Sequence, residues 1–199
     1  MKERIMTAVA EEIRARGLKF SIRDIADRLG ISTKTVYQHF ASKEEIVSAI
    51  VERSIREMKA SEAELLDDAP VGTLEKMRRA LVILPGGVAF SDIRVLRELQ
   101  KLYPKQWRLV DDYMNEGWDT IRSIAEEGIR SGVIRDFDFR LFIRMYVGAL
   151  YQIMDRGLEE GRRLSLEEAL ERMVDLLLNG IGRNVPEPAA GRSDDSQKG

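Results

Sequence analysis

Residues 21–43 read SIRDIADRLGISTKTVYQHFASK, which contains two short helical segments joined by a tight turn. The first segment, Ile22 to Leu29, repeats its apolar side chains at helical spacing, so one of its faces is expected to be buried. Gly30 permits the left-handed backbone that ends a helix, and Ser32 then caps the next helix. Because only about three residues separate the two helices, this stretch predicts a helix-turn-helix.

The second helix, predicted from Thr33 to Phe40, has few apolar positions. Val36 and Phe40 lie four residues apart and are expected to face the core, which leaves hydroxyl, amide, imidazole and amine groups outside. Such a helix fits the major groove of DNA, where its side chains reach base edges and phosphates. We therefore expect Gln38 to contact adenine, and Thr33 or Thr35 to contact a thymine methyl group or a base edge.

Residues 5–50 resemble the DNA-binding domain of the TetR family of bacterial transcriptional repressors. The resemblance is carried by IRDIA at 22–26, LGIS at 29–32, VY-x-HF at 36–40 and SKE at 42–44. It implies an all-α fold, in which an N-terminal three-helix helix-turn-helix DNA-binding domain joins a C-terminal helical bundle for ligand binding and dimerisation. We place these domains at 1–50 and 51–182. Residues 183–199 are expected to form a disordered tail, because they are polar and lack an apolar period.

The same resemblance implies roles for single residues. Tyr37 and His39 would contact phosphates, as would Lys43, which begins the next helix, where free N–H groups and the helix dipole favour an anion. The expected DNA contacts are Thr33, Lys34, Thr35, Tyr37, Gln38, His39, Lys43 and Arg23. Structural alternatives exist: Tyr37 also fits core packing with its hydroxyl at the edge, the single histidine His39 also fits a structural or solvated position, and Lys34 and Arg23 also fit plain solvation.

The composition excludes several kinds of catalytic site. Among 199 residues there is no cysteine and a single histidine, so we expect no disulfide, no thiolate site and no histidine-based metal centre or triad. The acidic pairs at 111–112 and 126–127 are adjacent in sequence, and adjacent side chains diverge by about 100° around a helix. We therefore expect no enzyme activity and no cofactor.

Charge and hydropathy favour a cytoplasmic protein. Residues 1–50 hold nine Lys and Arg against seven Asp and Glu, whereas residues 51–199 hold 23 against 27, so a slightly basic head precedes an acidic body. No apolar stretch approaches the roughly 20 residues that cross a bilayer, and the N-terminus lacks the apolar core of a signal peptide. The expected partners are double-stranded DNA and a small-molecule effector, with no membrane.

Breaks at glycine and proline divide the whole chain into about nine helices. Side-chain caps are expected at Ser21, Ser42 and Ser165, each with an acidic residue three places on, and at Thr73 and Asp138. Apolar residues from Trp107 to Ala125 recur at intervals of three and four, which predicts one long helix over this range.

The apolar stripes of the later helices fit two roles. Most of their residues must form the core, but methionine and aromatic side chains also adapt to the irregular wall of a ligand cavity. The candidates for such a wall are Met77, Leu81, Phe90, Leu99, Trp107, Met114, Trp118 and Tyr146. The sequence offers no site chemistry that identifies the ligand.

Residues 141–154, LFIRMYVGALYQIM, are apolar nearly all round, so their helix must be covered on more than one side. The last helix is similarly broad. A second subunit would cover both in a four-helix interface about a twofold axis, and the alternative is a thick monomeric core. The residues expected at the interface of this homodimer are Met145, Gly148, Ala149, Met173, Leu177 and Ile181.

Together these features predict a dimeric, sequence-specific transcriptional regulator, most simply a repressor, whose two recognition helices bind an inverted repeat. The resemblance implies that a small molecule in the C-terminal domain releases it from its operator. One alternative is a DNA-binding regulator without an inducer, which acts through a protein partner. Another is an enzyme built on a helical bundle, but the Glu-x-x-His metal motif of such enzymes is absent.

Overall fold

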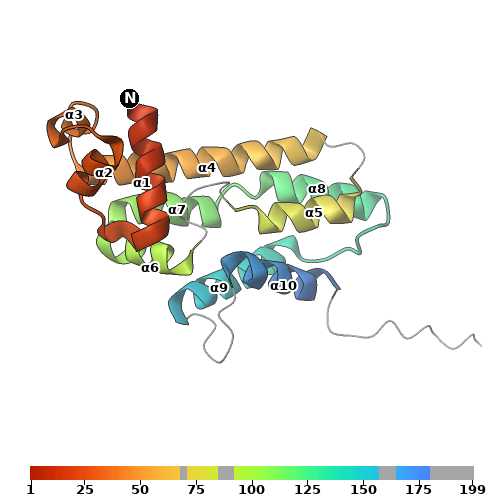
Figure 1. The fold of residues 1–199 in the computed structure, drawn as a ribbon. Coiled ribbons are helices and arrows are strands. Elements are labelled where there is room, and N and C mark those ends of the chain that lie inside the picture. The colour runs from red at the N-terminus through yellow and green to blue at the C-terminus, as the bar shows by residue number, and fades with distance from the viewer. Residues whose placement is uncertain (68–70, 85–91, 157–164, 180–199) are drawn as a thin grey trace, which may run out of the picture.

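Every regular element in the described part of the chain is a helix, which confirms the all-α prediction (Figure 1). The computed structural model describes residues 1–67, 71–84, 92–156 and 165–179, and the predicted tail lies outside them. The elements are α1 (Lys2–Arg16), the 3₁₀ helix η1 (Gly17–Lys19), α2 (Ile22–Leu29), α3 (Thr33–Tyr37), α4 (Lys43–Asp67), α5 (Thr73–Val82), α6 (Ile93–Leu102), α7 (Pro104–Asn115), α8 (Asp119–Arg130), α9 (Phe139–Arg156) and α10 (Leu166–Asn179).

The caps predicted around the first helices are present. The backbone N–H of Asp24 donates to Ser21 Oγ at 3.2 Å, and the Asp24 carboxylate accepts from the N–H of Ser21 at 2.7 Å. At the start of α4 the N–H of Glu45 donates to Ser42 Oγ at 3.1 Å. Gly30 ends α2 in the left-handed region, with φ 63°. Each cap satisfies backbone groups that a helix end would otherwise leave unpaired.

Helices α1 to α3 form a head at one end of the molecule, and its buried apolar residues belong to one hydrophobic cluster that continues into the body (Figure 1). Val36 and Phe40 belong to this cluster, as their spacing predicts, and are 0% and 1% exposed. Buried Glu12 of α1 accepts hydrogen bonds from the Nε and Nη2 atoms of Arg28 of α2, at 3.0 and 2.6 Å. This ion pair fixes α1 against α2, because a buried carboxylate is costly unless it is paired.

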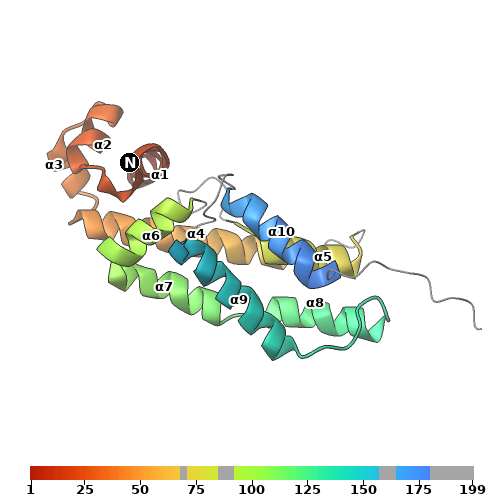
Figure 2. The same cartoon turned by 90° about the horizontal axis from the view of Figure 1, so that it is seen from below.

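Helix α4 runs without a break from the head into the body (Figures 1 and 2). Its first turns bury Ile46, Val47 and Ile50 on the side that contacts α1. The expected domain boundary after residue 50 therefore falls inside a helix, so the head and body share this helix and have no flexible linker between them at that point.

The body consists of α5 to α10. Helices α5, α7 and α8 contact α4, and α9 and α10 lie on the side of these helices away from α4 (Figure 1). The predicted caps at Asp138 and Ser165 are present, because their side chains accept from the N–H groups of Leu141 and Glu168. None of the described helices combines the length and the apolar character that crossing a membrane requires.

Two details of the body differ from the prediction. The long helix expected from Trp107 to Ala125 is two helices, α7 and α8, because Gly117 adopts φ 81° between them. This break raises the nine expected helices to ten α-helices in the described residues. Thr73 was expected to cap α5, but it is the first helical residue, and Gly72 occupies the cap position without a side-chain hydrogen bond.

The head also contacts the body through η1. The backbone N–H of Leu18 donates to the Glu98 carboxylate of α6 at 2.6 Å, and the Leu18 carbonyl accepts from Lys43 Nζ at 2.7 Å. Gly17, with φ 73° and ψ −163°, lies in a region of backbone space that is essentially limited to glycine. A Cβ atom at this position would also clash with the Glu98 carboxylate. Glycine is therefore required here by its backbone conformation, and a Cβ atom would in addition force the end of the Glu98 side chain to move.

We predict that Gly17→Ala lowers the free energy of unfolding by about 3 kcal/mol, because it combines backbone strain with the clash against Glu98. Gly30→Ala is the matched control: its φ of 63° is also positive, but a Cβ there meets no atom within 4 Å. We expect this control to cost only about 1 kcal/mol. Urea denaturation of both variants measures the difference, and equal losses would contradict a close contact between η1 and α6.

Candidate nucleic-acid interface and internal cavity

Helix α3 lies at the outer end of the head, away from the body (Figures 1 and 2). It is shorter than predicted, because its α-helical residues end at Tyr37 and the chain continues through a hydrogen-bonded turn to Phe40. Ser32 caps it as expected, by accepting from the N–H of Thr35 at 3.1 Å. The buried side of the segment is formed by Val36 and Phe40, so its remaining side chains face outward.

Most of the predicted DNA contacts lie together on this outward surface. Its exposed members are Thr33, Lys34, Tyr37, Gln38 and His39. Tyr37 is 53% exposed, which argues against the alternative that it packs in the core. Thr35 is half-buried, and its hydroxyl lies 2.9 Å from Ser32 Oγ, so this group already takes part in the cap.

The two remaining candidates are placed differently. Lys43 stands at the start of α4, but its ammonium donates to the Leu18 carbonyl and lies 4.3 Å from the centroid of the Phe20 ring. Burial lowers the pKa of this ammonium. Its side chain is therefore directed into the contact between head and body, and not outward as a phosphate contact requires. Arg23 is exposed on α2, and its Nε atom lies 3.8 Å from a carboxylate oxygen of Asp27, one helical turn further along.

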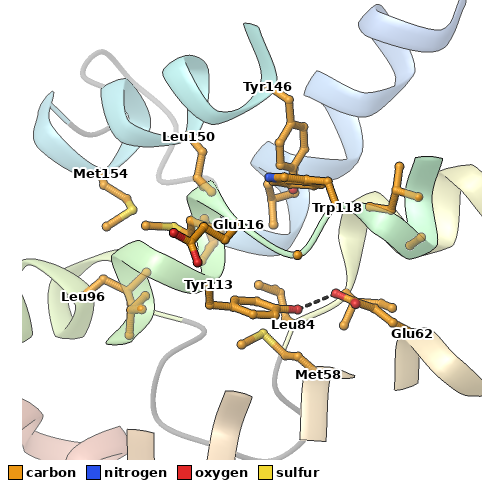
Figure 3. Close-up of a pocket in the computed structure, with 18 residues that line it drawn as sticks. Met58, Glu62, Leu84, Leu96, Tyr113, Glu116, Trp118, Tyr146, Leu150 and Met154 are labelled. Carbon is orange, nitrogen blue, oxygen red and sulfur yellow. Dashed lines mark hydrogen bonds between the residues drawn. The ribbon is translucent and has the colours of Figure 1, made fainter. Parts of the chain in front are cut away.

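The body contains a cavity of about 110 Å³ that is lined by residues from each of the helices α4 to α10 (Figure 3). Most of its wall is apolar, and methionines contribute from three helices, as Met58 of α4, Met114 of α7 and Met154 of α9. The wall also includes Glu62, Ala80, Ile83, Leu84, Leu96, Val110, Tyr113, Glu116, Gly117, Trp118, Ile121, Tyr146, Leu150, Leu166 and Leu170. This composition is typical of a small-molecule site, although the volume is below the usual range of about 300–1,000 Å³.

The structure brings only part of the predicted wall together. Met114, Trp118 and Tyr146 line the cavity. Three other candidates, Leu81, Leu99 and Trp107, are buried in the core and do not reach it, so their apolar spacing reflects packing alone. Met77 lines a different groove, between α5, α9 and α10, and Phe90 lies outside the described residues.

The sequence pattern did not indicate that α4 contributes to the cavity wall. Met58 and Glu62 are one helical turn apart, so they reach the cavity from the same face. The signal that could have found them is the length of α4, because a helix that continues past residue 50 carries its later turns into the body. Glu116 and Gly117 were missed for a second reason. They form the break between α7 and α8, and the prediction of one long helix contained no break there.

The polar groups in the cavity form a small network. The Tyr113 hydroxyl donates to the Glu62 carboxylate (Figure 3). The Tyr146 hydroxyl donates to the Leu81 carbonyl at 2.6 Å, and its ring meets the Trp118 indole edge-on, with 5.6 Å between the centroids. Burial raises the pKa of both tyrosines, and the hydrogen bond to Glu62 raises that of Tyr113 further. Both hydroxyls therefore remain protonated donors, whereas the buried Nε1 of Trp118 has no hydrogen-bond partner in the described part of the chain.

A third feature is the apolar surface that α9 exposes. Leu141 and Met145 are 54% and 53% exposed, one helical turn apart, and Gly148 continues this exposed line. The predicted interface residues Ala149, Met173 and Leu177 are half-buried, and Ile181 lies outside the described residues. Helices α9 and α10 lie side by side on the face of the molecule seen in Figure 2.

Comparison with known proteins gives concordant results. Residues 5–50 match the model of a family described as bacterial regulatory proteins, tetR family. The chain is 32% identical to the uncharacterized HTH-type transcriptional regulator YvaF of Bacillus subtilis, over 91% of this chain and 95% of that protein. It is 26% identical to the HTH-type transcriptional repressor KstR2 of Mycolicibacterium smegmatis, over 90% of each. A crystal structure of a TetR/AcrR regulator from Thermobifida fusca superposes with a TM-score of 0.67 at 26% identity. The match covers 92% of this chain and 98% of that one.

Proposed function

Because the chain belongs to the TetR family of bacterial transcriptional regulators, we propose that it is a cytoplasmic homodimeric repressor that a small molecule releases from a palindromic operator. The observation that carries this proposal is the position of α3. A short, capped helix presents polar side chains from the end of the head, where no other described part of the chain covers them. Repression is supported by the relative KstR2, which is itself a transcriptional repressor.

The exposed groups of α3 divide into two kinds. Gln38, at the end of the helix, offers both a donor and an acceptor, the combination that pairs with the edge of adenine in the major groove. Tyr37 and His39 lie on either side of it and are suited to phosphate contacts, which position the protein on DNA without reading its sequence. Since the Lys43 ammonium is engaged with Leu18, the backbone N–H groups at the start of α4 are the better phosphate donors there.

A homodimer is supported by the surface of α9. Large apolar side chains such as Leu141 and Met145 are costly to leave in water over a continuous area. Gly148 has open space around its missing Cβ, so a second helix can approach closely there. A twofold axis through this face would place one head on each side, which matches two half-sites of an inverted repeat.

Release by a ligand needs a route from the cavity to the head, and α6 supplies one. Three consecutive residues of this helix have separate contacts: Leu96 lines the cavity, Arg97 donates to the Met154 carbonyl, and Glu98 accepts from the N–H of Leu18. A ligand that displaces Leu96 would shift α6 and, through Glu98, η1. Its affinity for the shifted form must exceed its affinity for the DNA-bound form, because only this difference releases DNA.

We expect Gln38→Ala to relax the sequence preference at one base pair of each half-site, with a loss of about 1–3 kcal/mol on the preferred operator. Tyr37→Phe should instead weaken binding to all operator variants alike, because it removes a phosphate contact. The matched control is Gln100→Ala, an exposed glutamine of α6 outside the head. Selection of bound duplexes from a random pool, followed by titration of single-base variants, distinguishes a change in sequence preference from a uniform loss of affinity. A Gln38→Ala protein with wild-type preferences would remove Gln38 from the base contacts.

We expect the wild-type protein to sediment as a dimer at micromolar concentration and Met145→Glu to sediment as a monomer, because the substitution places a charge in the apolar interface. Leu102→Glu is the control, since Leu102 of α6 is similarly exposed, at 46%, but lies on another helix. Analytical ultracentrifugation distinguishes the two variants. A monomeric wild-type protein, or a dimeric Met145→Glu protein, would refute an interface on α9.

We expect Glu98→Ala to uncouple the cavity from the head. A small molecule that binds the variant as it binds the wild type, as found by thermal shift against a metabolite panel, should weaken operator binding about fivefold less in the variant. Glu127→Ala, an exposed carboxylate of α8, should retain full coupling. The measurement is an operator titration with and without the molecule, and unchanged coupling in Glu98→Ala would rule out this route.

A further inference from the structure

The cavity has an acidic wall. Its charged residues are Glu62 of α4 and Glu116 at the end of α7, and no Lys, Arg or His of the described chain lines it. Glutamate side chains are ordinarily ionised near neutral pH. A ligand that enters the cavity therefore meets negative charge and no compensating positive side chain.

Glu62 has little internal compensation. Its only hydrogen bond among the described residues comes from the neutral hydroxyl of Tyr113. Because burial and this bond raise the pKa of Tyr113, the hydroxyl stays protonated and donates a single hydrogen bond. The second oxygen of the Glu62 carboxylate is left for another partner.

Two cations lie near the wall, and the Nη2 of one of them, Arg97, is buried without a hydrogen-bond partner among the described residues. Arg97 donates its Nε–H to the Met154 carbonyl, and Lys59 Nζ lies 6.0 Å from the centroid of the Tyr113 ring. Lys59 lines a separate surface groove between α4 and α7, and neither cation belongs to the cavity wall. Neither Arg97 nor Lys59 therefore neutralises the Glu62 carboxylate by direct contact.

Aromatic rings surround the same space. Tyr113, Trp118 and Tyr146 line the cavity, and Figure 3 shows the Glu116 carboxylate in the middle of the view, to the left of the Tyr113 and Trp118 rings. The faces of such rings carry negative electrostatic potential and attract cations, most strongly in the case of tryptophan. Beyond them the wall is hydrocarbon and thioether, as at Met58 and Leu96, which suits an apolar group.

From these groups we infer that the effector is an organic cation, an amine or ammonium group carried on an apolar body. The inference rests on the proposed role of this cavity as the effector site, and it adds the chemical class of the ligand. The positive group lies between the carboxylates of Glu62 and Glu116 and contacts the aromatic rings, and the apolar body fills the methionine-lined side. An anion of the same shape would place its charge beside two carboxylates, at an energetic cost.

Three probes with the same six-carbon chain test this: hexylammonium, 1-hexanol and hexanoate, each titrated calorimetrically into the full-length protein. We expect hexylammonium to bind about tenfold more tightly than 1-hexanol, and hexanoate to bind most weakly. Tighter or equal binding of 1-hexanol or hexanoate would overturn the inference.

Glu62→Gln keeps an acceptor for Tyr113 but removes the charge, and should lower the preference for hexylammonium over 1-hexanol by about tenfold. Glu64→Gln is the matched control, because it removes the same charge from an exposed position on the same helix. Equal effects of the two variants would also overturn the inference. Glu116→Gln, at an exposed position, gives a second test if Glu62→Gln does not fold.

Operator titrations with each probe separate this inference from the proposed function. Selective binding of hexylammonium that leaves operator affinity unchanged would support the acidic site and count against release by a ligand. Release of the operator by 1-hexanol or hexanoate, but not by hexylammonium, would support release by a ligand and refute a cationic effector.

Discussion

The unbroken hydrogen bonding of α4 is the constraint on which the arrangement of this protein depends. Its 25 residues span about 37 Å at the usual rise of an α-helix, from the head to the wall of the cavity. Ile46 and Val47 near one end are packed in the head, and Met58 and Glu62 near the other line the cavity. Because one rigid element carries both sets of residues, the position of the recognition helix is defined relative to the cavity wall.

Helix α3 illustrates how little burial is needed to hold a recognition element. Five residues are too few for a stable isolated helix. Burying Val36 and Phe40 contributes about 1.5–3 kcal/mol for each side chain, and the Ser32 cap adds about 1 kcal/mol. Because these few contacts hold the helix, the remaining side chains do not contribute to its stability, with the exception of Thr35, whose hydroxyl is hydrogen-bonded to the capping Ser32.

The cavity shows the opposite distribution of polar groups. The buried indole N–H of Trp118 has no hydrogen-bond partner among the described residues, and the half-buried Glu62 carboxylate accepts a hydrogen bond there only from the neutral Tyr113 hydroxyl. A buried donor without a partner lowers the stability of a protein. Apolar residues of similar size at Glu62 and Trp118 would remove this cost. Polar groups that a fold leaves unsatisfied in a cavity are suited to a bound partner, and the lining here offers the carboxylates of Glu62 and Glu116, three aromatic rings and the N–H of Trp118.

The sequence by itself determined the helix-turn-helix of the head, the caps at Ser21, Ser32 and Ser42, and the burial of Val36 and Phe40. These features depend on residues within one or two helical turns of each other, so spacing is enough to predict them. Only the tertiary structure decided which apolar residues reach the cavity and which only pack: Trp107 and Trp118 share a stripe in the sequence, yet only Trp118 lines the wall. The contact of Leu18 with Glu98 joins residues 80 apart in the chain, and no local pattern encodes such a distance.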